Sequence, residues 1–93
     1  MNKYEIMFIV KPDVEDDVRN TVIENFKNVL SEDGGTVDNV DEWGLRDFAY
    51  EIKHYTKGYY VVFDVTTSAD NISEFERLSR INPNVMRHLT LRR

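Results

Sequence analysis

Two strand-like segments constrain the fold of this chain most strongly, because each alternates apolar side chains with a period of two over eight positions. The first, KYEIMFIV at residues 3–10, places four apolar side chains on one face: Tyr4, Ile6, Phe8 and Val10. The second, YYVVFDVT at residues 59–66, does the same with Tyr59, Val61, Phe63 and Val65. Such strands bury one face under a second layer of structure.

Two amphipathic helices supply that second layer. After Asp13, a candidate N-cap, apolar residues recur at helical spacing up to Gly34 and Gly35: Val18, Val22, Phe26, Val29 and Leu30. A second helix is expected to begin at a cap on Asp70 and to end before the NPN segment at 82–84. Its inward side chains are expected to be Ile72, Phe75, Leu78 and Ile81.

The segment 36–54 is strand-like but irregular, since Val37 and Val40 differ in parity and Gly44 interrupts the run as a β-bulge would. Phe48, Tyr50 and Ile52 then resume an alternation. HYTKG at 54–58 predicts a turn, so this strand and the next form a hairpin.

A last strand is expected at 85–91, facing inward either with Val85, Leu89 and Leu91 or with Met86, His88 and Thr90. The resulting order, β-α-β-β-α-β, predicts an α+β ferredoxin-like fold over the single domain 1–93. That fold has a four-stranded antiparallel sheet in the order 4-1-3-2, with both helices on one face.

The segment 57–65, KGYYVVFDV, resembles the third strand of an RNA-recognition domain, in which outward rings stack on bases. In that register Asp64 would be buried without a partner, which costs several kcal/mol or raises its pKa. The motif also lacks the small residue expected at Tyr60 and the aromatic residue expected at Val61. We therefore expect Tyr60, Val62 and Asp64 to face away from the helices.

This register gathers four apolar side chains on the open face of the sheet, from its two central strands: Met7, Ile9, Tyr60 and Val62. A cluster of this kind indicates a binding surface for a protein partner. The alternative is that small sheets commonly leave scattered apolar residues in water.

The net charge of −5 argues against a nucleic-acid partner, but its distribution does not. Five of the twelve basic residues lie in 77–93, which has no acidic residue, so residues 1–76 hold seven basic and 17 acidic residues and a net charge of −10. Antiparallel first and last strands would bring Lys3 beside Arg92 and Arg93, with Arg87 on the same edge. A cationic edge suits phosphates; the alternative is solvated charge at a frayed terminus.

The sequence offers no catalytic or metal-binding pattern. It has no cysteine, and the acids Asp13, Glu15, Asp16 and Asp17 lack the spacing of a calcium loop. Glu5 and Glu51 have no accompanying nucleophile or phosphate-binding glycine loop. We expect a non-enzymatic protein without metal or cofactor, intracellular and cytoplasmic, with no membrane segment.

WGLRDFAYEI at 43–52 resembles the signature of the bacterial small-subunit ribosomal protein family S6, in which glycine, a basic pair, an apolar residue, Ala-Tyr and isoleucine follow one another. The matching positions are Gly44, Arg46, Ala49, Tyr50 and Ile52. KYEIMFIVKPDV at 3–14 and EFERLSRINPNVMRH at 74–88 also resemble that family, so the similarity covers essentially the whole chain. Asp47 departs from it, because the family usually carries its second basic residue there.

The resemblance implies a structural constituent of the small (30S) ribosomal subunit, located in the cytoplasm on the ribosome. The implied partners are ribosomal protein S18 and the central domain of small-subunit rRNA, and the free chain is expected to be monomeric. By the same resemblance, rRNA contacts are expected at Lys3, Tyr4, Arg46, Tyr50, Arg87, His88 and Arg92. Strand alternation by itself places Tyr4 and Tyr50 in the core. The alternative function is a small-ligand sensing module, which the same fold often hosts.

Overall fold

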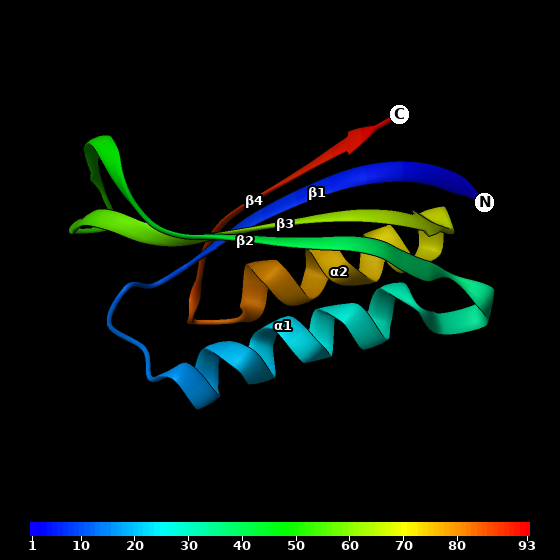
Figure 1. The fold of residues 1–93 in the computed structure, drawn as a ribbon, viewed down its shortest axis with the longest axis horizontal. Helices are drawn as coiled ribbons and strands as arrows, with labels where there is room; N and C mark the ends of the chain where they lie inside the picture. Colours follow the sequence, from blue (N-terminus) through cyan, green and yellow to red (C-terminus); the bar gives the residue numbers. More distant parts are fainter.

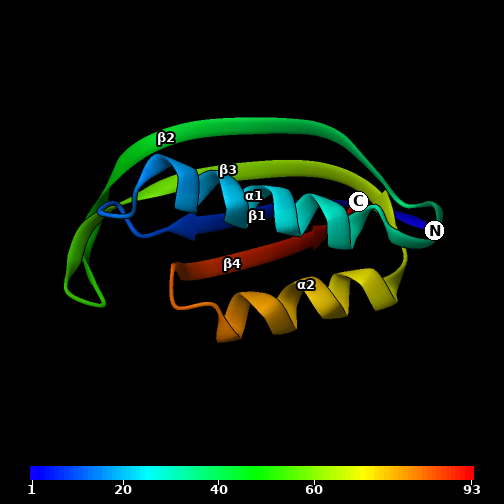
Figure 2. The same ribbon diagram turned by 90° about the horizontal axis from the view of Figure 1, so that it is seen from below.

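The computed structural model describes residues 1–93 as one α/β sandwich of two layers. Its elements are β1 (Asn2–Val10), α1 (Asp16–Leu30), a short 3-10 turn (Glu32–Gly34), β2 (Thr36–Ile52), β3 (Tyr55–Thr67), α2 (Ala69–Ile81) and β4 (Val85–Arg92). The sheet order is β2-β3-β1-β4, which is the predicted order read from the other edge. Both helices cover one face and leave the other open (Figure 1, Figure 2). The ferredoxin-like prediction is confirmed.

The core lies between the helices and the covered face of the sheet. Phe8 of β1 meets Phe26 of α1 edge-on with ring centroids 5.0 Å apart, and Phe26 meets Phe75 of α2 at 4.9 Å. Such edge-to-face pairs add to the stabilisation from apolar burial. The inward side chains predicted on both central strands lie in this core or against it, so the register that turns Asp64 away from the helices is confirmed.

Both predicted helix caps are wrong. α1 begins at Asp16, and its N-cap residue Glu15 makes no side-chain capping bond. At α2 the Ser68 side chain, rather than that of Asp70, accepts the Asn71 N–H at 3.1 Å. Each sequence pattern offered several residues able to cap a helix, and the connection to the preceding strand decides which one is used. Two predicted inward residues, Val18 and Ile81, are exposed.

Three register shifts interrupt the pairing of β2 with β3: one lies between Asp47 and Ile52, next to the hairpin turn, and the remaining two are bulges. One, between Val37 and Asn39, puts Val37 and Val40 on the helix side despite their different parity. The other, between Glu42 and Gly44, confirms the predicted bulge, and Gly44 takes a φ of +80° that suits glycine.

The turn predicted at residues 54–58 is displaced, because Tyr55 already belongs to β3. Lys53 and His54 form a two-residue turn with φ of 49° and 69°. Positive φ at both positions matches the twist that a tight hairpin requires. β3 consequently begins at Tyr55, earlier than the sequence pattern indicates, and the β2–β3 hairpin is longer by those residues.

On β4 the alternatives are decided by register. His88 pairs with Phe8 and Thr90 pairs with Ile6, so both face the helices, while Leu89 and Leu91 face the open side. A register shift opposite Ile9 and Val10 lets Val85 also reach the core. The inward residues of β4 therefore come from both predicted sets: Val85 from one, and His88 and Thr90 from the other. No helix has the length and apolar character needed to cross a membrane.

Candidate functional site

The open face of the sheet carries a continuous apolar surface. Met7 pairs with Val62 and Ile9 pairs with Tyr60, so the four residues predicted to cluster there are neighbours. Ile9 is 4% exposed, so it supports the surface from within and offers little area to a partner. Further side chains extend the surface across β2 and β4, and we call the whole set the open-face patch: Met7, Ile9, Trp43, Phe48, Tyr60, Val62, Leu89 and Leu91. All four strands contribute, so these apolar side chains are connected neighbours across the sheet.

Trp43 forms the β2 part of this patch. Its indole lies parallel to the Tyr60 ring, with an interplanar angle of 8° and centroids 6.0 Å apart, and its ring N–H donates to Asp41 at 3.1 Å. The bulge before Gly44 brings Trp43 over Tyr60. Trp43 is still 45% exposed, so one ring face remains free. The sequence pattern indicated the bulge at Gly44 but did not indicate that Trp43 stacks on Tyr60.

The far end of the β2–β3 hairpin curves out over the open face, away from the helices (Figure 1). Between this hairpin and β4 lies a groove of about 400 Å³, lined by Met7, Ile9, Phe48, Tyr50, Tyr60, Arg87 and Leu89 among others. Tyr50 is 68% exposed. The alternation that places it in the core is therefore wrong, because no helix covers this part of the hairpin.

Three of the cations predicted to contact RNA project on the open side of the sheet. Lys3 pairs with Thr66, Arg46 with Gly58 and Arg87 with Ile9, all in open-face register positions. None of the three forms a salt bridge. Lys3, Arg46 and Arg87 thus place unpaired positive charge around the open-face patch.

The predicted cationic edge is only partly present. Arg93 N–H donates to the Lys3 carbonyl at 2.9 Å, so the first and last strands do meet there. However, the Arg93 guanidinium binds the Glu5 carboxylate at 2.7 Å and lies 3.1 Å from that of Asp64. Arg92, on the helix side, donates to the Asn2 amide oxygen at 3.0 Å. The charge of Arg93 is therefore neutralised within the chain, whereas that of Arg92 is not.

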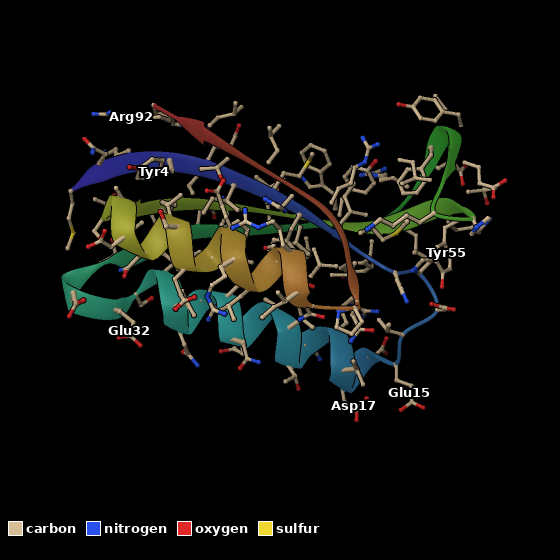
Figure 3. The ribbon with its side chains drawn as sticks, turned by 180° about the vertical axis from the view of Figure 1, so that it is seen from behind. Tyr4, Glu15, Asp17, Glu32, Tyr55 and Arg92 are labelled. Carbon is tan, nitrogen blue, oxygen red and sulfur yellow. The ribbon has the colours of Figure 1, made fainter.

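Two predicted contact residues turn toward the helices. Tyr4 is 8% exposed and belongs to the core cluster, at the same end of the sheet as Arg92 (Figure 3). His88 is half-buried, with its ring edge-on to Phe75 at 6.0 Å. The ring of Tyr4 is thus a core element and not a surface on which a base can stack.

A polar cluster holds β2 and β3 to α1 on the helix side. The Tyr59 hydroxyl donates to Glu42 at 2.9 Å, and the Arg19 guanidinium lies over the Tyr59 ring at 4.0 Å. Burial first, and the bond to the Glu42 carboxylate second, raise the pKa of Tyr59. A separate group lies on the open side near the start of β2, where hydrogen bonds from Thr66 and Thr36 lower the pKa of Asp38.

No cluster of three or more histidine, aspartate or glutamate side chains is arranged to hold a metal ion. The site therefore consists of an apolar sheet surface, a groove beside it and unpaired cations at its margin. This arrangement is suited to binding macromolecules.

Comparison with known proteins identifies the family. The family model described as ribosomal protein S6 matches residues 3–92. The chain belongs to the ribosomal protein S6 family. Among solved structures, the crystal structure of 30S ribosomal protein S6 from Thermotoga maritima is 36% identical in sequence, with a TM-score of 0.92. The match covers 99% of this chain and 87% of that one.

Membership of the S6 family confirms the resemblance seen in the segment 43–52. It gives the chain a structural, non-enzymatic role in the ribosome.

Proposed function

We propose that the chain binds the central domain of small-subunit rRNA together with ribosomal protein S18, using the open face of the sheet for the protein and the surrounding cations for RNA. The observation that carries this proposal is the open-face patch itself. It is contiguous over four strands and has unpaired Lys3, Arg46 and Arg87 around it.

The protein side of the proposal rests on the chemistry of the patch. Trp43 and Tyr60 form a flat aromatic pair, and Met7, Val62 and Leu89 surround it with aliphatic surface. Exposed aromatic residues and methionine are enriched at the centres of protein interfaces. A partner that covers this patch would remove its apolar area from water, which favours association.

The RNA side rests on charge. Arg46 and Arg87 lie on strands at the two edges of the sheet, and neither forms a salt bridge. Unpaired arginine at the margin of an apolar surface suits the phosphates of an RNA that passes beside a bound protein. Lys3 lies on the same open side, and exposed Tyr50 offers a ring for stacking. Arg92 projects on the helix side, so it would meet RNA only at the edge formed by β4. Tyr4 is excluded by its burial, and His88 contributes only from the margin.

The acidic remainder of the chain is compatible with this function. The body carries a net charge of −10 over residues 1–76, and only the surface just described needs to approach RNA. A basic protein partner would supply further positive charge. RNA binding is therefore expected to be weak for this chain alone and stronger in a complex with the partner.

The test is a titration against a fragment of the small-subunit rRNA central domain, with and without S18, at two salt concentrations. Binding that needs S18 and weakens with salt supports a joint interface. Absence of RNA binding in both conditions, with the chain folded, would refute the proposal and favour a ligand-sensing role for the groove.

A further inference from the structure

A second hollow, of about 180 Å³, lies between the end of α2 and the start of β4. Its lining includes Lys53 from the hairpin turn, Ser79 and Arg80 from α2, and Arg87 and His88 from β4. The last two residues also line the open-face groove, so the two hollows adjoin. We call this hollow the α2–β4 pocket.

The α2–β4 pocket is cationic. Lys53, Arg80 and Arg87 form no salt bridge, and no acidic residue lines the pocket. Arg77, one helical turn before Arg80, is paired with Glu74. Three cations line one hollow that holds no counter-ion, so an anion bound there would offset their mutual repulsion.

Ser79 gives an independent indication of a ligand. The residue is 3% exposed and lines the pocket, yet its hydroxyl has no hydrogen-bond partner in the protein. A buried polar group without a partner is costly and uncommon. The hydroxyl can donate a hydrogen bond to an acceptor in this hollow, which is also lined by the side chains of Lys53, Arg80, Arg87 and His88.

We propose that the α2–β4 pocket binds a single phosphate group, held by Lys53, Arg80 and Arg87 and by a hydrogen bond from Ser79. The carboxyl end of α2 opposes this with a partial charge of roughly −0.5. Three full positive charges outweigh it. In the chain as a component of the ribosome, the phosphate is a backbone phosphodiester of RNA; free phosphate is the other source of the same chemistry.

This inference rests on the proposed function for its ligand but concerns residues outside the predicted RNA contacts, namely Lys53, Ser79 and Arg80. The adjoining hollows mean that an RNA strand in contact with Arg87 at the open-face groove could continue over Arg87 into this pocket. A phosphate seated there would fix the strand's register at the start of β4.

The test uses Ser79→Ala and Arg80→Ala, with Arg77→Ala as the control that makes the same charge change one turn away. Amide NMR spectra of each protein are recorded during titration with inorganic phosphate, and separately with the rRNA fragment and S18. Phosphate should shift the amides of residues 79–80 and 85–88 in the wild type and in Arg77→Ala but not in Arg80→Ala. Arg80→Ala should weaken RNA binding about tenfold and reduce its salt slope by about one.

Ser79→Ala separates binding from folding. Because the hydroxyl has no partner in the free protein, its removal should leave the midpoint of thermal unfolding unchanged or raised, while phosphate binding weakens about tenfold. A lower unfolding midpoint with unchanged binding would overturn the proposal and make Ser79 a structural residue.

The two titrations keep this inference distinct from the proposed function. Phosphate shifts without an effect of Arg80→Ala on RNA binding would confirm the pocket but assign it to free phosphate. No phosphate shifts, together with wild-type RNA affinity in Arg80→Ala, would overturn the inference while the proposed function stands. Failure of the wild type to bind RNA would refute the proposed function, and the phosphate titration would still decide the pocket.

Discussion

Gly58 packs against Ile9, so closely that a Cβ at Gly58 would overlap Ile9 Cγ2 and stand 2.8 Å from Phe48 Cζ. The absence of a side chain lets Phe48 and Ile9 pack together at the floor of the open-face groove. The lysine-glycine-aromatic sequence that resembles an RNA-recognition strand therefore has a packing role here. Gly58 leaves space for the side chains of Ile9 and Phe48, so the role of the glycine is packing and not RNA recognition.

Gly58→Ala is expected to lower the free energy of unfolding by about 1–3 kcal/mol, because the added methyl group overfills this contact. Urea unfolding of the free chain measures it. In the Gly58→Ala background, Ile9→Ala should cost less than it does in the wild type, since it removes the atom in collision. If Ile9→Ala lowers the free energy of unfolding equally in both backgrounds, the added methyl group does not collide with Ile9, and the strands have moved apart to accommodate it.

Val62→Asp should leave the chain folded but abolish association with S18, since Val62 lies in the open-face patch. The neighbouring change Val61→Asp, at a fully buried side chain, should unfold the protein. Circular dichroism and a pull-down with S18 measure the two effects. If Val62→Asp unfolds the chain, or pairs normally, the open face is not the partner surface.

Arg87→Ala should weaken binding to the rRNA fragment and reduce the salt slope by about one, because Arg87 is unpaired. Arg93→Ala, the same change just beyond the end of β4, should alter affinity much less, because Glu5 and Asp64 already hold that charge. Filter binding over a series of salt concentrations compares them. Equal losses from the two variants would show that the intramolecular ion pairs give way to RNA.

Asp47→Arg restores a basic residue where the S6 family usually has one, and should tighten rRNA binding. Asp47 lines the open-face groove, so the change replaces repulsion of a phosphate with attraction. Asp17→Arg, which makes the same charge change at an exposed site on α1, is the control. An equal gain from both variants would reflect net charge alone and would remove Asp47 from the RNA surface.

Stability should fall in alkaline solution through Tyr59. Its pKa is raised in the folded chain, so folding favours the neutral phenol; the stabilisation is complete below the unfolded value of about 10 and is lost as pH rises through the folded value. Urea unfolding above and below about pH 10 should show this loss, and Tyr59→Phe should reduce it. Tyr50→Phe, at an exposed ring, should leave the alkaline loss as in the wild type. If Tyr59→Phe does the same, the effect does not come from Tyr59.

The sequence by itself determined the order of elements, the central-strand faces and the family. These follow from local periodicity: one face of β1 and β3 is apolar throughout, and any register that reversed it would bury Asp64. The prediction of the bulge at Gly44 likewise followed from a residue that alone tolerates positive φ easily. The four central residues of the open-face patch were predictable because both strands alternate without interruption.

Only the tertiary structure decided which charges are free and how far the apolar patch extends. Arg93 and Arg87 look alike in sequence, but Arg93 meets Glu5 and Asp64 across strands that are distant in the chain. Likewise, the contributions of Trp43 and Phe48 depend on a bulge and on the curvature of a hairpin whose turn was displaced. Pairing of charges, burial of Tyr4 and exposure of Tyr50 arise from contacts between distant segments, which local periodicity does not encode.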